Sequence, residues 1–532
     1  MRDNLWYKYT MNPIELSIFS SRISAICDEM GIVLQRAAFS PNIKDRLDFS
    51  CAIFDAKGEL CAQAAHIPVH LGSMAYATRG IIDQVNWQKG DMLILNDPFL
   101  GGTHLPDVTL VAPVFLNDDL LGFVVNRAHH ADIGANSPGS MPVSSTLAEE
   151  GMIIPPTLLI KQGQRDEVFF QQLLKPVVNK TQSRGDFSAQ VSSVQIGLER
   201  LLALINAMGV SVYLGALKSL NDYAERLAAS ALAEIPEGDY IFSDVMDDDG
   251  QGNEKIKIAA AISVKGNHIH VDFNGTAKQV DGNINCPLSV AAAAVYYVFR
   301  CLMPKQTPAC AGTFRPISLS APKGCLLNAN RPAAVAAGNV ETSTRVVDVV
   351  MGALAKAIPE KLAAASHGSM NNVAMGARNE RNENASWDYY ETLGGGMGAF
   401  YQGNGLSAVQ THMTNTLNTP IESLELHYPL RITRYEIRDG SGGKGGSDKG
   451  FSGGDGLIRE FEFLDDADVT LLTERRTTKP WGLNGGEDGA AGGNYYDDKP
   501  VAGKVSLKVK AGKRLRIETP GGGGFGKLEY LG

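Results

Sequence analysis

The sequence predicts a mixed α+β protein with several layers, and three features support this. An apolar helical repeat lies near the N-terminus, a predicted β-hairpin between histidines and aspartates follows, and the C-terminal fifth is rich in short strands and glycine. We expect three parts: residues 11–235 with the hairpin and a helical layer, residues 236–430 as a middle α/β domain, and residues 431–532 as a β-rich, glycine-dense region.

Composition is that of an ordinary globular protein and excludes several classes of function. Of the 532 residues 44% are hydrophobic and 20% are charged, and the net charge is −9. The chain has no dense Lys/Arg block, which argues against nucleic acid or an anionic membrane as its main partner. The start lacks a signal-peptide pattern, and the chain has no run of 18 apolar residues, so we expect a cytoplasmic protein. The seven cysteines are scattered without a CxxC, which indicates neither a disulfide framework nor a zinc ribbon.

The first elements are a helix and a short hairpin. Apolar residues recur at helical spacing from Asn12 to Ala37, with Asn12 as the expected cap. The segments DFSCAIFD (48–55) and ELCAQ (59–63) alternate as strands do, and the turn 55–58 joins them. A helix is expected at residues 74–85, and a strand at 87–98 that delivers Asn96 and Asp97 into the loop GGTHLPD.

The hairpin that follows is the most informative stretch. Val108–Phe115 and Leu121–Ala128 read as strands joined by a turn at 117–119, so the two outer ends of the pair should meet. This brings the pattern His104-x-x-Asp107 next to His129-His130-x-Asp132. Imidazole nitrogens with carboxylate oxygens suit Zn²⁺, Mn²⁺ or Fe²⁺ better than Ca²⁺. A polar loop with hydrogen-bonded histidines is the alternative, but two such groups at matched hairpin ends favour a metal-bearing hairpin.

The rest of the chain carries weaker signals. Residues 169–233 are predicted to be mainly helical, 238–276 to form short strands, and 291–302 and part of 333–357 to be helices. The turn Asp247–Gly250 fails the EF-hand spacing, because the required glutamate would fall on Ile258. His268 and His270 are expected on an ordinary strand face. Gly394–Gly396 indicates close backbone approach, and no Walker motif or GxSxG elbow occurs.

Several motifs in collinear order resemble one family. In chain order these motifs are NIKDRLDFSCAIFD, HIPVHLGSM, NDPF-x-GGTHLPD, HHADIG, NTPIESLE, GSGGKGG and TPGGGGFG. Together they resemble the B-type subunit of the hydantoinase B, 5-oxoprolinase and acetone carboxylase family, over about residues 11–526. The resemblance implies metal ligands at His104, Asp107 and His129, with Asp48 or, if the local alignment slips, Asp45 upstream. The origin of residues 1–10, which precede the resemblance, stays open.

The resemblance also implies an activity that needs a second chain. It implies a heteromeric ATP-dependent amidohydrolase that opens a cyclic amide such as a hydantoin, 5-oxoproline or another lactam. An A-type subunit would bind ATP and Mg²⁺ and phosphorylate the substrate, in an (AB)₂ heterotetramer. In that reading His130 and Asp132 support the ligands, and Asp132 or Asp97 acts as general base.

Two alternatives remain open from the sequence. One is a subunit of an ATP-dependent ketone carboxylase that uses bicarbonate, although the chain is shorter than the large subunit of an acetone carboxylase. The other is a non-catalytic subunit with a structural metal. A structural site is normally closed by four protein ligands, whereas a catalytic one leaves a position for water.

Overall fold

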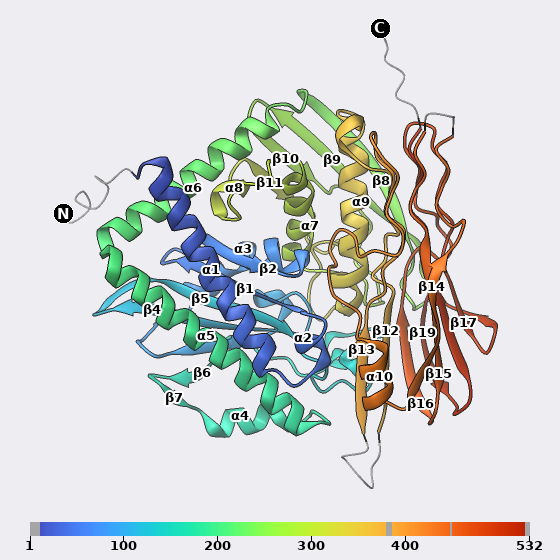
Figure 1. The fold of residues 1–532 in the computed structure, drawn as a ribbon, viewed down its shortest axis with the longest axis horizontal. Helices are drawn as coiled ribbons and strands as arrows, with labels where there is room; N and C mark the ends of the chain where they lie inside the picture. Colours follow the sequence, from blue (N-terminus) through green and yellow to red (C-terminus); the bar gives the residue numbers. More distant parts are fainter. Residues whose placement is uncertain (1–10, 379–385, 447–449, 527–532) are drawn as a thin grey trace.

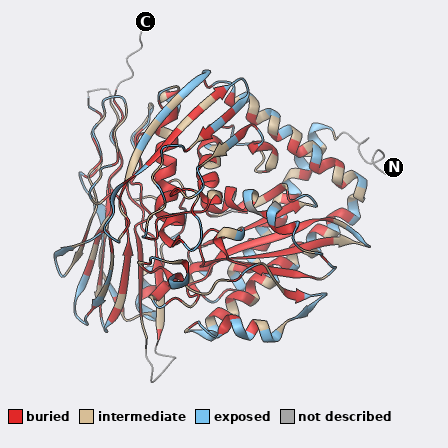
Figure 2. Cartoon of the chain, turned by 180° about the vertical axis from the view of Figure 1, so that it is seen from behind, coloured by how far each residue is buried: buried red, intermediate tan, exposed pale blue. Residues whose placement is uncertain are grey.

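Across the residues that the computed structural model describes, helices are combined with four β-sheets, so the chain is a mixed α+β protein as predicted (Figure 1). The structure describes residues 11–378, 386–446 and 450–526. Buried residues fill the sheets and the helix faces turned toward them, and exposed residues follow the outer surfaces (Figure 2).

A seven-stranded sheet with the order β2-β1-β5-β4-β3-β6-β7 forms the N-terminal half. Its strands are β1 (Phe49–Asp55), β2 (Leu60–Ala65), β3 (Met92–Leu95), β4 (Asp107–Leu116), β5 (Asp119–His129), β6 (Thr157–Lys161) and β7 (Gln164–Arg165). Both predicted hairpins are confirmed, β1–β2 and β4–β5. In the second, Leu116 pairs with Asp119, and Asn117 takes a positive φ of 54° in the tight turn between them.

Long helices cover one face of this sheet. The helices of this half are α1 (Pro13–Ala37), α2 (Pro41–Lys44), α3 (Pro68–Ile82), α4 (Glu167–Leu174), α5 (Lys180–Met208) and α6 (Val210–Leu232). α1 and α5 cross the sheet side by side (Figure 1) and bury Ile23, Met30 and Val194 against it. The predicted first helix is confirmed, and Asn12 forms a capping box with Glu15. α3 starts at Pro68, earlier than expected, and packs on α7 on the opposite face.

Among the described residues, no single helix is long and apolar enough to cross a membrane. The consecutive helices α5 and α6 pass that test of length and composition only as a pair, bent by 107°.

The middle of the chain forms a second sheet with the order β11-β10-β9-β8. Its elements are β8 (Gly238–Asp248), β9 (Glu254–Lys265), β10 (His268–Asp272), β11 (Ile317–Ser320), α7 (Leu288–Cys301), α8 (Ala311–Phe314) and α9 (Ser343–Leu354). The acidic stretch before Gly250 is a hairpin turn as expected, because the Asp249 carboxylate accepts backbone N–H groups of residues 251 and 253. A π-helical turn at Gly338–Thr342 leads into α9.

Two further sheets pack face to face in the C-terminal part. They have the orders β13-β12-β16-β19 and β14-β15-β20-β17-β18, and their inner faces share one apolar cluster. The elements are β12 (Asn372–Ala377), β13 (Trp387–Glu391), α10 (Ile421–His427), β14 (Leu430–Arg438), β15 (Gly456–Phe463), β16 (Ala467–Leu472), β17 (Gly493–Tyr496), β18 (Lys499–Val501), β19 (Lys504–Val509) and β20 (Arg514–Glu518). The first of these sheets takes strands from both sides of residue 430, and the predicted domain boundaries stay predictions.

The glycine-rich segments lie against one another. A Cβ on Gly396 would stand 2.0 Å from the carbonyl oxygen of Gly454, and one on Gly453 would stand 2.0 Å from that of Gly522. Any side chain at these positions would therefore push two backbones apart. The close approach expected at Gly394–Gly396 is confirmed, and these glycines serve packing within the chain.

Candidate metal centre

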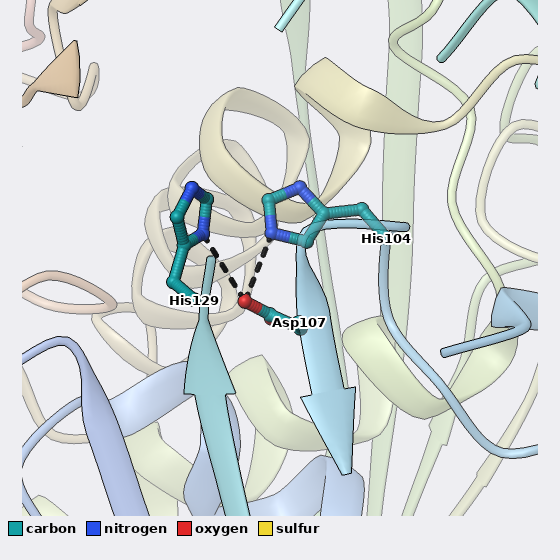
Figure 3. Close-up of side chains that lie close together, drawn as sticks. All are labelled: His104, Asp107 and His129. Atoms are coloured by element: carbon teal, nitrogen blue, oxygen red, sulfur yellow. Dashed lines mark hydrogen bonds and ion pairs between the residues drawn. The ribbon is translucent and has the colours of Figure 1, made fainter. Parts of the chain in front are cut away.

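The β4–β5 hairpin brings a carboxylate and two imidazoles together at one end of the large sheet. Asp107 and His129 are direct partners across the two strands, and His104 precedes them in the loop (Figure 3). Asp107 Oδ1 lies 3.1 Å from His104 Nε2 and 3.2 Å from His129 Nδ1. All three side chains are buried. The convergence predicted from the hairpin is therefore present.

The second oxygen of Asp107 is held by other side chains. Thr103 Oγ1 donates to Asp107 Oδ2 over 2.7 Å, Asn339 Nδ2 donates over 3.4 Å, and His70 Nε2 lies 3.3 Å away. Burial raises the pKa of the Asp107 carboxyl, but the neighbouring His104 and His70 imidazoles outweigh burial and hold it well below its usual range. Asp107 is therefore an anchored carboxylate.

His104 is fixed through the backbone of a distant loop. Its Nδ1 donates to the carbonyl oxygen of Ala336 over 3.3 Å, because a carbonyl can only accept. The N–H groups of Val335 and Ala336 in turn donate to Glu150 Oε1, over 2.8 and 2.9 Å. In the neutral imidazole the proton then sits on Nδ1, so the lone pair of Nε2 points toward Asp107 and His129.

His129 is held by an aromatic ring from the C-terminal part. It stacks on Tyr390 with ring centroids 4.9 Å apart and planes 12° apart. The Tyr390 hydroxyl donates to Asn372 Oδ1 over 2.5 Å, and Asn372 Nδ2 donates to Glu341 Oε1 over 2.7 Å. The orientation of His129 thus depends on β12 and β13.

The residues present fit a divalent transition metal. Within the described part of the chain, the buried Nε2 of His129 has no hydrogen-bond partner, which is costly for a polar atom unless something binds it, and the Nε2 of His104 contacts only Asp107, the third candidate ligand. One donor atom each from His104, Asp107 and His129 lies within 4.8 Å of the other two. They line a cavity of about 20 Å³, room for about one water or ion. Two imidazoles with one carboxylate suit Zn²⁺, Mn²⁺ or Fe²⁺.

The two candidates for the upstream ligand lie in different places. Asp48 lines this cavity and stands 3.9 Å from the Arg46 guanidinium. Asp45 lines a separate, acidic cavity together with Asp132 and Asp388. The geometry therefore favours Asp48 as the fourth ligand, which stays a prediction.

The three residues predicted to take part in catalysis do not line the metal cavity. Asp132 accepts the backbone N–H groups of Gly134 and Val178, both over 2.7 Å, so its carboxylate holds a loop. His130 follows His129 on the same strand and therefore points to the other face, where its Nε2 meets Gln190 Oε1 at 2.9 Å. Asp97 caps the turn Pro98–Leu100 and pairs with Arg331. A role for Asp132, His130 or Asp97 in catalysis therefore stays a prediction without support from the geometry of the cavity.

Sequence reasoning missed the outer partners of the site. His70 belongs to the motif HIPVHLGSM, so that motif was an available signal; the first turn of α3 brings it to Asp107 and to Ser50 Oγ, 3.1 Å from its Nδ1. Tyr390 and Asn339 come from segments more than 200 residues away, and no local pattern marks them.

Comparison with known proteins agrees with the resemblance in the sequence. The model of the family "Hydantoinase B/oxoprolinase" matches residues 12–528. An uncharacterized protein of Methanocaldococcus jannaschii is 40% identical, with 97% of this chain and 91% of that protein covered. A putative B-type chain of a D-/L-hydantoinase from Pseudomonas sp. is 31% identical, with 97% and 90% covered. 5-oxoprolinase 1 of Arabidopsis thaliana is 38% identical, with 96% and 42% covered, so this chain spans less than half of its length.

Solved structures share the fold. The crystal structure of an ATP-dependent caprolactamase from Pseudomonas jessenii superposes with a TM-score of 0.89 at 26% identity, and 97% of this chain and 92% of that chain are covered. A nucleotide-free acetone carboxylase superposes with a TM-score of 0.85 at 17% identity over 97% and 76% of the chains, which shows likeness of fold alone. Since the family model covers nearly the whole sequence, the chain belongs to the hydantoinase B/oxoprolinase family.

Proposed function

We propose that this chain is the metal-bearing subunit of an ATP-dependent enzyme that opens a cyclic amide, such as a hydantoin, 5-oxoproline or another lactam. The observation that carries the proposal is the buried set of His104, Asp107 and His129, which lines a cavity of the size of one water or ion and leaves the Nε2 of His129 without a hydrogen-bond partner among the described residues. The proposal is also supported by the names of two relatives, a hydantoinase subunit and a 5-oxoprolinase, and by the shared fold of an ATP-dependent caprolactamase.

The chain's own residues would hold and orient the metal. His104, Asp107 and His129 would supply three ligands and leave a position for water, and Asp48, which lines the same cavity, would lie beside the metal as a candidate for a further ligand. A divalent metal bound there supplies Lewis-acid chemistry, which acidifies a coordinated water. Ala336 fixes the tautomer of His104, and Tyr390 fixes the ring of His129. Thr103 and Asn339 align the Asp107 carboxylate, whose ionised form His104 and His70 favour.

A partner chain completes the proposal. An unstrained lactam is a poor electrophile, and phosphorylation of its oxygen would make the ring carbon attackable. This sequence has no Walker motif, so we assign ATP and Mg²⁺ to an A-type subunit that activates the substrate. Because an activated intermediate would be lost in bulk water, we propose a permanent complex of two chains of each type.

Reconstitution tests the proposed function directly. The chain is purified with and without a co-expressed A-type chain and incubated with ATP and a lactam, a hydantoin or 5-oxoproline. We expect ADP formation coupled to ring opening only in the complex, and none when His104→Ala replaces the wild-type chain. ATP use that requires acetone and bicarbonate instead would identify a carboxylase, and an unimpaired His104→Ala complex would leave the metal with a structural role.

A further inference from the structure

A second cavity, here called the α7 pocket, lies next to the metal cavity. It has a volume of about 510 Å³, within the range of small-molecule sites, and is lined by the end of α7, by α9 and by residues 360–366, 397–400 and 410–415. Thr414 lines both cavities, and Pro68 of the α7 pocket lies between Ile67 and Val69, which line the metal cavity. One layer of residues therefore separates the two cavities.

The walls of the α7 pocket are mainly apolar; its polar side chains come from the segment 410–415, and also include Ser366, Lys361 and Glu360. The apolar wall is made by Val298, Leu302, Met351, Leu362 and Met397. The polar end is the segment 410–415, where Thr414 Oγ1 donates to Gln410 Oε1 over 3.0 Å. A small set of polar groups in an apolar cavity is the usual pattern of a site that orients a compact organic ligand. The polar end is the one that adjoins the metal cavity.

The backbone at the polar end is unusual. His412 has a φ of +59°, a conformation that few residues other than glycine adopt. Its ring is nine-tenths buried, and its Nε2 has no hydrogen-bond partner among the described residues; the nearest acid is Asp348, whose Oδ1 is 4.0 Å away. Strained backbone with an unsatisfied polar atom is typical of binding sites rather than of packing alone.

The interior of the α7 pocket is uncharged near neutral pH. Burial lowers the pKa of His412 and raises the pKa values of Cys301 and Tyr297, so all three are neutral. Of the described charged side chains that line it, Lys361 is paired with Glu234, and Glu360 is exposed. An anion buried inside would lose its hydration, and Lys361, the cation among the described lining residues, is exposed and already paired with Glu234, so that it would not offset the loss.

We propose that the α7 pocket binds the hydrocarbon part of an uncharged lactam, with the amide group at Thr414 and next to the metal cavity. This inference rests on the proposed function and narrows its substrate class. A carboxylated lactam such as 5-oxoproline fits poorly, because its carboxylate would enter an apolar, uncharged space or remain outside and leave the pocket unfilled. A neutral lactam with several CH₂ groups gains binding free energy for each one that it buries against the apolar wall.

Binding to the full-length chain tests this inference without the partner. ε-Caprolactam and 5-oxoproline are titrated into the purified chain and followed by ligand-observed NMR. We expect caprolactam to bind at least tenfold more tightly than 5-oxoproline. Ala363→Trp, which adds volume at a half-buried wall position, should weaken caprolactam binding at least tenfold. Ala233→Trp, the same change at an exposed position that does not line the α7 pocket, should leave it unchanged.

Folding is monitored by Tm and metal content, and Met351→Trp is the second variant if Ala363→Trp unfolds. Equal or tighter binding of 5-oxoproline, an absence of caprolactam binding, or full binding by a folded Ala363→Trp chain would each overturn the inference. The outcome is separable from the proposed function. If Ala363→Trp loses caprolactam binding but the reconstituted wild-type complex opens no ring, the pocket is supported and the proposed activity is not. If the complex opens the ring and Ala363→Trp leaves that activity intact, the proposed activity is supported and the pocket is not.

Discussion

The buried carboxyl of Glu341 should make the stability of the protein depend on pH in a defined window. Its Oε1 accepts from the Met370 N–H over 2.9 Å and from Asn372 Nδ2, whereas Oε2 has no hydrogen-bond partner among the described residues. Burial, reinforced by the charge of Glu474, raises the pKa of Glu341 from 4.5 to about 8. The group is therefore protonated in the folded protein at neutral pH.

The sign and size follow from proton linkage. Between pH 4.5 and 8 the folded state binds a proton that the unfolded state has released, so the free energy of unfolding falls as pH rises. At about 1.4 kcal/mol per pH unit, this group lowers the free energy of unfolding by about 3 kcal/mol between pH 5.5 and 7.5. Glu341→Gln keeps the Oε1 acceptor and cannot ionise, so it removes this loss.

Urea unfolding of the wild type and Glu341→Gln at pH 5.5 and 7.5 measures the effect. From pH 5.5 to 7.5, the free energy of unfolding of the variant should rise by about 3 kcal/mol relative to that of the wild type, because the wild type loses the contribution of one bound proton over two pH units. Glu254→Gln, the same change at an exposed position of β9, is the matched control. If Glu341→Gln and the wild type change in parallel, Glu341 is ionised in the folded state and the reasoning is refuted.

Further predictions concern the metal and the partner. His104→Ala and His129→Ala should each lose most of the bound transition metal while the fold persists, and His268→Ala, at an exposed position of β10, is the control. Full metal occupancy of the two variants by elemental analysis would contradict the site. Asp48→Asn should weaken metal binding more than Asp45→Asn, and the opposite order would assign the upstream ligand to Asp45. The isolated chain should show no stoichiometric ATP binding at micromolar concentration by calorimetry. Co-expression with an A-type chain should give one heteromeric species by size-exclusion chromatography with light scattering, whereas separate migration with persistent ATP-dependent ring opening would disprove a permanent complex.

Local patterns predicted the part of the site that one supersecondary unit builds. A hairpin's register follows from its turn and its alternation, so the pairing of Asp107 with His129 could be predicted from about 25 residues. Closeness in sequence did not bring Asp132 into the metal cavity, although it lies only three residues beyond His129. After the strand ends, its carboxylate turns to the backbone N–H groups of Gly134 and Val178, and no strand period constrains that loop.

The contacts that orient the candidate ligands could not be predicted from local sequence patterns, because tertiary packing sets them. His104 depends on Ala336, from the loop before the π-helical turn, and His129 depends on Tyr390 of β13. Neither residue type has a pattern that points to a metal ligand across more than 200 residues. The same applies to the α7 pocket, whose walls come from segments spread between Pro68 and Asn415.

The candidate metal centre therefore connects the large sheet, β13 and the loop before α9 rather than belonging to the hairpin alone. The large sheet supplies Asp107 and His129, β13 of the C-terminal part supplies the ring that stacks on His129, and the loop before α9 supplies the carbonyl that fixes His104. Each support lowers the freedom of one ligand before a metal binds, so the ligands need little reorganisation. Because a bound metal stabilises only the arrangement in which all these parts are docked, its binding free energy adds to the cohesion between them.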